Sequence, residues 1–161
     1  MLLCPCCSLK TYEMCCGLYL ENRQIAQTPE QLMRSRYSAF SLAKLDYIRQ
    51  TMQGKALIGF NEFEYKERNT KVNWVGLTVI QSYLEGSNAG FVEFSARFID
   101  RNQLKYVHEL SEFNYIDHVW YYVDGTSIQS PHTYNKHKIA RNGPCPCGSD
   151  KNFKNCHENK G

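Results

Sequence analysis

The sequence predicts an α+β fold in which helices pack on one face of a curved antiparallel sheet. Two observations predict it. Helical patterns occupy residues 28–54, and patterns of period two follow from about residue 62 to residue 125. Helices followed by a run of strands are typical of α+β proteins rather than of alternating α/β proteins. A third observation, a cluster of cysteines near each end, predicts two small metal-bound units flanking this fold.

The 161 residues are enough for one ordinary core with a small module at each end. We divide the chain into an N-terminal knuckle (1–20), a central α+β domain (21–128), a linker (129–144) and a C-terminal knuckle (145–161). No stretch has the roughly 18 consecutive apolar residues of a membrane span, and the start of the chain lacks the regions of a signal peptide. We therefore expect a cytoplasmic protein that does not insert into membranes.

The first helix is predicted to begin at Thr28. Thr28 suits the N-cap, Pro29 the first helical position, and Gln31 the reciprocal partner of a capping box. Leu45 falls outside the apolar arc of this helix, so we expect the helix to end before it. A second, short helix is predicted over about residues 46–54.

Four strand segments then follow, each rich in β-branched and aromatic residues. They read NWVGLTVIQSY, GFVEFSARFID, QLKYVHELSEFNYI and HVWYYVDG, and turn-prone residues separate them. In the second segment Val92, Phe94, Ala96 and Phe98 alternate with more polar residues and are predicted to form the core face. Consecutive strands with short turns indicate an antiparallel meander.

The cysteine clusters share one spacing. Each position of the first set lies 141 residues before its counterpart in the second: Cys4, Cys6, Cys15 and Cys16, then Cys145, Cys147, Cys156 and His157. Four soft sulfur and nitrogen donors suit tetrahedral zinc and leave no open position for a reacting water. We therefore expect two structural zinc ions. Metal-free thiols, the alternative, do not explain the common register, and disulfides are disfavoured in the cytoplasm.

The formal net charge of +3 is unevenly distributed. Residues 1–20 are neutral, residues 21–128 carry −1 and residues 129–161 carry +4. Two zinc–thiolate centres would bring the total near zero. Only the tail stays basic, so nucleic-acid binding through residues 129–161 remains a local alternative rather than a property of the whole surface.

The C-terminal phrase CPCGSDKNFKNCH resembles the SEC-C motif found at the end of the preprotein translocase motor SecA. The matching positions outside the metal ligands are Gly148, Ser149, Lys151, Phe153 and Lys154. The N-terminal copy departs from the motif at Cys7, where the motif has glycine, and at Glu13, where it has lysine. Cys7 would need a positive φ at that turn, which costs a non-glycine residue about 1 kcal/mol or more.

A second resemblance covers nearly the whole chain. MRSRYSAF at 33–40, HELSEF at 108–113 and WYYVDG at 120–125 are similar to the bacterial YchJ family. That resemblance implies a domain similar to nuclear transport factor 2, with a cone of helices against a bent sheet, as in cystatin-like folds. It supplies no activity. Leu110 and Glu112 stand where the family often has arginines, so any role of those basic positions does not transfer.

On these grounds we expect a non-enzymatic, zinc-binding interaction or adaptor protein. The C-terminal knuckle is its expected contact surface, through Lys151, Phe153 and Lys154. By resemblance the partner is a translocation chaperone such as SecB, or the ribosome. The N-terminal copy has only Lys10 and Tyr12, with Glu13 opposing the same partner, and is expected to be mainly structural.

The alternative is a ligand-binding or catalytic central domain. Arg36 falls within the apolar arc of the first helix, where a charge requires a partner, and Glu93 or Glu109 is its expected partner. His108 could act as an acid or base, although a packed, hydrogen-bonded role is the simpler expectation. No phosphate-binding glycine loop or nucleophile elbow is present. We favour a structural ion pair for Arg36 and leave a small-molecule ligand as the second possibility.

Overall fold

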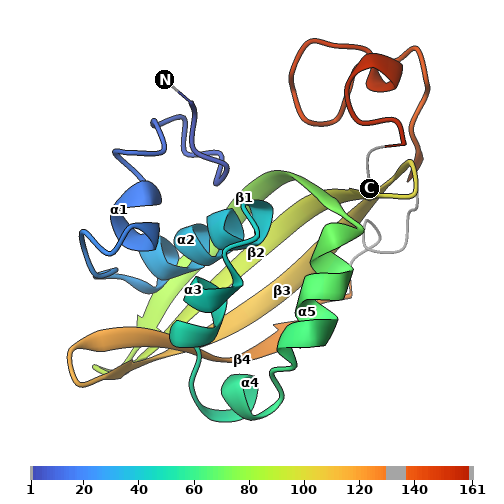
Figure 1. Ribbon diagram of the computed structural model, residues 1–161. Helices are drawn as coiled ribbons and strands as arrows, with labels where there is room; N and C mark the ends of the chain where they lie inside the picture. The colour runs from blue at the N-terminus through green and yellow to red at the C-terminus, as the bar shows by residue number, and fades with distance from the viewer. Residues whose placement is uncertain (1, 130–136, 160–161) are drawn as a thin grey trace.

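The computed structural model describes residues 2–129 and 137–159 and confirms the α+β class (Figure 1). The helical segments are α1 (Gly17–Leu20), α2 (Pro29–Ser41), α3 (Leu45–Gln50), α4 (Gly54–Ile58), α5 (Glu62–Thr70) and the 3₁₀ turn η1 (Phe153–Asn155). The strands are β1 (Asn73–Glu85), β2 (Ala89–Asp100), β3 (Gln103–Ile116), β4 (Val119–Ser127) and β5 (His137–Lys138). No helix within the described ranges is long and apolar enough to cross a bilayer.

The start of α2 follows the predicted capping pattern. Thr28 Oγ1 accepts a hydrogen bond from the Gln31 amide at 3.1 Å, and Gln31 Oε1 accepts one from the Gln27 amide at 2.7 Å. The reciprocal bond thus reaches one residue further back than in the standard capping box. The helix ends at Ser41, before Leu45, as expected.

The segment that precedes β1 is a helix, where a strand was expected. The period-two pattern was expected from about residue 62, but α5 occupies residues 62–70. Phe63 and Tyr65 alternate with charged residues and imitate a strand, while Asn61 caps a helix through a 3.2 Å bond from the Glu64 amide to its side-chain oxygen. Two glutamates in the first turn stabilise the helix, because their negative charges lie near the positive end of its dipole. The cap and these charges favour a helix over residues 62–70, although the apolar residues alternate as they would in a strand.

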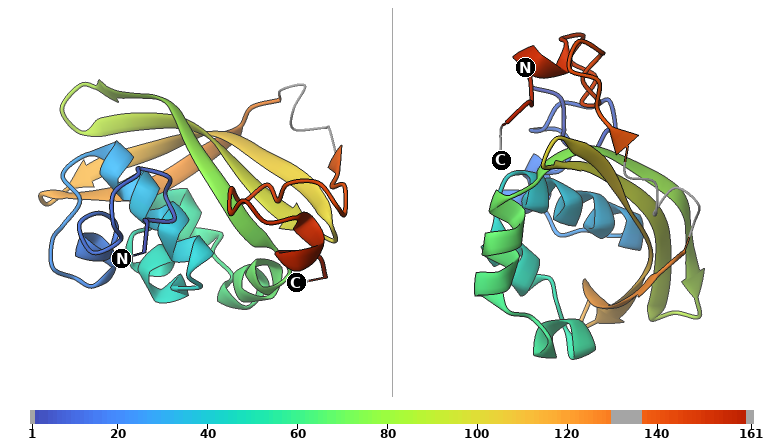
Figure 2. Two further views of the ribbon diagram at one scale, coloured as in Figure 1. Left: turned by 90° about the horizontal axis from the view of Figure 1, so that it is seen from above. Right: turned by 90° about the vertical axis from the view of Figure 1, so that its right-hand side faces the viewer.

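The sheet is an antiparallel meander in the order β1-β2-β3-β4, and β5 pairs with the start of β3. The helices cover one face, and the sheet bends around them (Figure 2). Val92, Phe94 and Ala96 are buried against these helices, as the alternation predicted. Phe98, the fourth predicted core residue, is only half-buried and lines a cavity. Register shifts in β1 after Trp74 and after Val79 mark bulges, which increase local bending.

The two ends of the chain pack on different parts of this fold (Figure 1). The N-terminal cysteines join the main core between helices and sheet, and the C-terminal knuckle forms a second, smaller core with Ile99. Residues 130–136 of the predicted linker lie outside the described residues. The His137–Lys138 part of that linker forms β5, which ties the C-terminal knuckle to β3.

Candidate metal centres and central cavity

The N-terminal knuckle brings four thiols together. The sulfur atoms of Cys4, Cys6, Cys15 and Cys16 all lie within 4.8 Å of one another. Cys6 Sγ is 3.6 Å from Cys15 Sγ, and Cys15 Sγ is 4.0 Å from Cys16 Sγ. Tetrahedral zinc with bonds of about 2.3 Å places its sulfur ligands about 3.8 Å apart. The donor set therefore fits one tetrahedral cation.

The C-terminal knuckle offers three thiols and an imidazole. Cys145, Cys147, Cys156 and His157 also have their donor atoms within 4.8 Å of one another. His157 Nδ1 lies 3.2 Å from the sulfurs of both Cys145 and Cys156, and Cys147 Sγ is 3.5 Å from Cys156 Sγ. This site also fits a single ion with four protein ligands.

The two knuckles have the same backbone conformation. The Cys4 amide donates to the Lys10 carbonyl at 2.8 Å, and 141 residues later the Cys145 amide donates to the Lys151 carbonyl at 2.9 Å. Isolated bridges, Leu3 with Thr11 and Pro144 with Asn152, repeat at the same offset. The register read from the sequence is therefore a structural repeat.

A serine supports the third ligand in each copy. Ser8 Oγ lies 3.2 Å from Cys15 Sγ, and Ser149 Oγ lies 3.2 Å from Cys156 Sγ. A hydroxyl beside a coordinating sulfur orients the ligand and stabilises its thiolate form. Ser149 is a position of the SEC-C motif, but the motif alone does not show that either serine contacts a ligand sulfur.

Cys7 adopts the turn that the motif reserves for glycine. Its φ is 60°, close to the 76° of Gly148 in the other copy. The Cys7 thiol donates to the Pro5 carbonyl at 3.5 Å and accepts from the Leu77 amide at 3.4 Å. Cys7 therefore lies outside the group of four ligands and contacts the edge strand β1.

Without metal, the thiols of each cluster do not ionise alike. Hydrogen bonds from Cys16 and Cys6 lower the pKa of the Cys4 thiol. Hydrogen bonds also lower the pKa of Cys147, against the effect of burial. Hydrogen bonding to Cys4 raises the pKa of the Cys16 thiol, and burial raises the pKa of the Cys145 thiol to about 12. Crowded, buried thiolates repel one another and lose hydration. A divalent cation offsets both effects by replacing the protons, so each cluster suits a bound metal better than a set of free thiols.

The N-terminal site is part of the main core. Cys6 and Cys16 are 0% and 1% exposed, and α2 contacts the knuckle directly. Ser38 Oγ lies 3.7 Å from Cys4 Sγ, and Arg34 Nη1 donates to the Cys6 carbonyl at 3.1 Å. Metal at this site would therefore fix the position of α2 as well as the knuckle.

The C-terminal site is anchored by Phe153, which corrects its expected role. Phe153 is 1% exposed and packs in the small core that contains Ile99, with Leu104 and Ile139 against it. It is therefore unavailable to a partner while the knuckle is docked. Lys151 and Lys154, the other predicted contact residues, are exposed.

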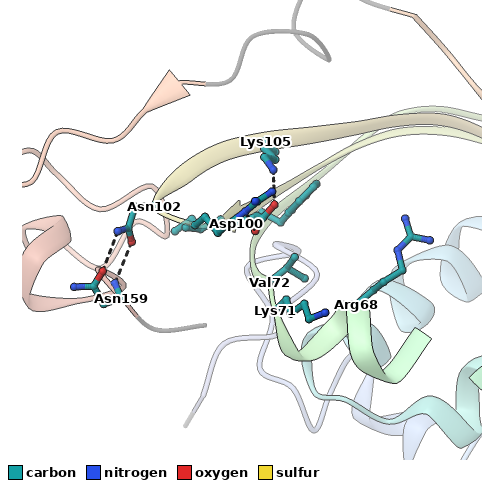
Figure 3. A pocket seen from close by; sticks show the side chains of 10 residues that line it. Arg68, Lys71, Val72, Asp100, Asn102, Lys105 and Asn159 are labelled. Carbon is teal, nitrogen blue, oxygen red and sulfur yellow. Dashed lines mark hydrogen bonds and ion pairs between the residues drawn. The ribbon is translucent and has the colours of Figure 1, made fainter. Parts of the chain in front are cut away.

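A basic cleft of about 930 Å³ lies between α5, the β2–β3 turn and the C-terminal knuckle (Figure 3). Asn102 and Asn159 close one side through two hydrogen bonds of 3.0 Å. Its ion pairs join Lys71 to Glu67 and both Arg101 and Lys105 to Asp100. Much of the positive charge in this cleft is thus neutralised within the protein, which weakens it as a nucleic-acid site.

A separate cavity of about 300 Å³ lies between the helices and the sheet. Apolar and aromatic side chains form most of its wall: Met33, Phe40, Trp74, Phe94, Phe98 and Val107. Arg36 lines it, is 5% exposed, and donates from Nη1 to the Ile48 carbonyl at 2.8 Å and to Thr51 Oγ1 at 2.6 Å. The Arg36 guanidinium lies over the Tyr122 ring, 4.5 Å from its centroid.

Glu109 occupies the same cavity but does not pair with Arg36. Its Oε1 accepts from Ser111 Oγ at 2.7 Å and from the Tyr122 hydroxyl at 3.2 Å. No ion pair within 4.0 Å joins Arg36 to a carboxylate among the described residues. A Cβ at Gly125 would lie closer than van der Waals contact to the Glu109 carboxylate and to the Tyr122 hydroxyl, so a larger residue there would displace this arrangement.

Glu93 and His108, the other two predicted pocket residues, lie elsewhere. Their side chains form a 2.8 Å contact between His108 Nε2 and Glu93 Oε1, and neither lines the cavity. Both alternate with residues that face the helices, namely Phe94 and Glu109, and so point to the other face of the sheet. The expected group of four is therefore divided. Arg36 and Glu109 line the cavity on the helix side of the sheet, whereas Glu93 and His108 lie on the other face, and Glu93 is not the partner of Arg36.

Comparisons with known proteins agree with this architecture. A family model described as YchJ, middle NTF2-like domain, matches residues 28–125, and a SEC-C motif model matches residues 141–159. The chain is 40% identical to a UPF0225 protein of Photorhabdus laumondii over 157 aligned residues. The alignment covers 96% of this chain and 97% of that protein.

Two solved structures are similar along most of their length. One is the solution structure of a SEC-C motif containing protein from Rhodopseudomonas palustris, with a TM-score of 0.72 and 35% identity over 78% of this chain and 98% of that one. The other is the crystal structure of a SEC-C motif containing protein from Psychrobacter arcticus, with a TM-score of 0.68 and 31% identity over 95% and 93%. The chain belongs to the YchJ-like UPF0225 family of SEC-C motif proteins.

Proposed function

We propose that this protein is a zinc-binding, non-enzymatic interaction protein whose C-terminal knuckle contacts a partner with an acidic surface. One observation supports this most strongly. The two knuckles have similar backbone conformations, and each has four donor atoms. The N-terminal knuckle is part of the main core, whereas the C-terminal knuckle belongs to a small, separate core and carries the exposed Lys151 and Lys154. The first has the placement of a structural support and the second that of a contact surface.

Zinc is the metal that suits these donors. Thiolates and imidazole are soft or borderline ligands, and tetrahedral four-coordination by Cys4 or Cys3His sets is typical of structural zinc. Four protein donors leave no position for a metal-bound water, which argues against hydrolysis at either centre. The role proposed for zinc is therefore to fold and place the knuckles.

The charge of the C-terminal knuckle favours an acidic partner. Lys151 and Lys154 are exposed and take part in no ion pair among the residues that the structure describes. In the N-terminal copy Glu13 replaces the second lysine. Lysines on a rim steer association with an oppositely charged surface. By resemblance to the SEC-C motif, the partner is a SecB-like chaperone, with the ribosome as the alternative.

Charge reversal tests this assignment. We expect Lys151→Glu combined with Lys154→Glu to abolish recovery of a partner that wild-type protein captures by crosslinking in a cell extract. Lys10→Glu, at the position equivalent to Lys151, is the matched control and should retain the partner. Treatment of the extract with nuclease distinguishes a ribosomal partner from a chaperone. Unchanged recovery by the double variant would reject the C-terminal knuckle as the contact surface.

A further inference from the structure

We propose that the central cavity is a binding site for a small amphipathic carboxylate, with Arg36 contacting the anionic group. This inference is independent of the knuckles, because none of the eight metal ligands lines the cavity. It rests on a buried charge that forms no ion pair within 4.0 Å among the described residues, a neighbouring carboxylate that accepts hydrogen bonds from other groups, and an apolar chamber of suitable size.

Arg36 is the unusual feature of this cavity. It is 5% exposed, yet the partners of its Nη1 donor are neutral oxygens of Ile48 and Thr51. Burial lowers the pKa of Arg36 to about 10, so the side chain remains charged at neutral pH. A buried cation is costly unless an anion compensates it. A ligand carboxylate in the cavity would supply that compensation and accept bonds from the guanidinium.

Glu109 forms no direct ion pair with Arg36: burial lowers the pKa of Arg36, and the nearby Glu109 charge only partly opposes that lowering. Hydroxyl groups of Ser111 and Tyr122 donate to the Glu109 carboxylate, and Gly125 leaves room for that arrangement. The same Tyr122 ring lies beneath the Arg36 guanidinium. Glu109 thus holds the tyrosine ring in place, while the ring orients the arginine. Arg36 is therefore a cation held in one position whose neighbouring carboxylate is hydrogen-bonded to other groups, so a ligand anion could bind to it.

The rest of the chamber suits an apolar body. Trp74 contacts Phe98 and Phe40 at ring-centroid distances of 5.3 and 6.1 Å, so these residues form a continuous aromatic wall. The Trp74 indole nitrogen donates to Asn69 at 2.9 Å and is therefore not an unmet polar group inside the cavity. About 300 Å³ is at the small end of ligand sites, which excludes nucleotides and long-chain lipids.

The cavity also has a charged neighbour on its outer side. Arg68, Val72 and Phe98 line both this cavity and the basic cleft beside α5. Figure 3 shows Arg68 and Val72 at the cleft. Among the described residues, Arg68 takes part in no ion pair, unlike the other basic residues that line the cleft. An unpaired positive charge at the shared wall favours anions over cations as ligands.

The test uses two ligands of the same shape. We propose isothermal titration of the zinc-loaded full-length chain with 2-naphthoate and with the neutral 2-naphthamide. The expected result is at least tenfold tighter binding of the carboxylate. Arg36→Met should remove this preference, and Arg36→Lys, which retains the charge, should keep part of it. The Arg36→Lys variant keeps the test decisive if Arg36→Met fails to fold.

A matched pair of substitutions on β3 locates the site. Val107 lines the cavity, whereas Leu110 lies on the opposite face of the same strand. Val107→Phe should fill the chamber and abolish binding of both ligands, and Leu110→Phe should leave both affinities unchanged. Equal affinity for acid and amide, no binding of either, or binding that survives Val107→Phe would overturn the proposal.

Discussion

Replacing Phe153 with alanine should release the C-terminal knuckle from the sheet without unfolding it. Removal of a buried phenylalanine typically costs about 3 to 5 kcal/mol. Phe153 packs both within its own knuckle and against Ile99 and Leu104, so about half of that cost, roughly 2 kcal/mol, concerns docking. At about 1.4 kcal/mol per factor of ten, the docked population should fall relative to the undocked one by roughly 30-fold.

Amide hydrogen exchange measured by NMR resolves this docking. The Asn159 amide bonds to Asn102 Oδ1 at 3.0 Å, across the docked interface. The Cys145 amide instead bonds within the knuckle. In the Phe153→Ala variant, protection of the Asn159 amide from exchange should fall by roughly 30-fold. Protection of the Cys145 amide should be unchanged, because bound zinc stabilises the folded knuckle by about 10 kcal/mol or more. Lys154→Ala, at the exposed neighbour, should change neither amide.

Two results would refute this reasoning. Unchanged protection of Asn159 in Phe153→Ala would show that the aromatic ring does not anchor the knuckle. Equal loss of protection at Asn159 and Cys145 would show that docking and the internal fold of the knuckle are one cooperative unit.

Three further predictions concern the metal sites. Ser8→Ala and Ser149→Ala should each weaken zinc binding about tenfold at their own site and leave the other site unaffected, as measured by competition with a chelator; equal effects at both sites would contradict this. Zinc should be released as the pH falls, because protons compete with the metal for its ligands, and most directly at Cys145, whose pKa burial raises to about 12 without metal; a chromogenic chelator reporting a pH-independent affinity would oppose it. Cys7→Gly should keep full zinc content and raise the free energy of unfolding by up to about 1 kcal/mol in denaturant titrations, because φ at that turn is 60°; loss of zinc would make Cys7 a ligand.

Much of the metal sites could be predicted from sequence because their determinants are local. The ligands of each knuckle lie within 13 residues, from Cys4 to Cys16 and from Cys145 to His157, and the common offset fixed their register. The α2 cap was predictable for the same reason. Burial of Phe153 was not, because it depends on contact with Ile99 on a distant strand.

The cavity was harder to predict because it depends on how strands pair. Arg36 was identified from the helical arc, but its neighbour Tyr122 comes from β4, where a register shift near Phe113 sets which side chains face inward. The sequence did contain the signal that separates Glu93 from Arg36. Glu93 directly precedes the core residue Phe94 on the same strand, and consecutive residues of a strand point to opposite faces of the sheet. Glu93 was nevertheless expected to pair with Arg36, because a buried arginine requires a partner.

Native mass spectrometry of the purified chain supplemented with zinc tests most directly whether two closed metal sites organise the protein. The measurement counts bound ions per chain, and the Cys7→Ser variant serves as a control for the fifth thiol of the N-terminal knuckle. We expect two zinc ions in both proteins. One ion or none in the wild-type chain, or loss of an ion in the Cys7→Ser variant, would contradict it.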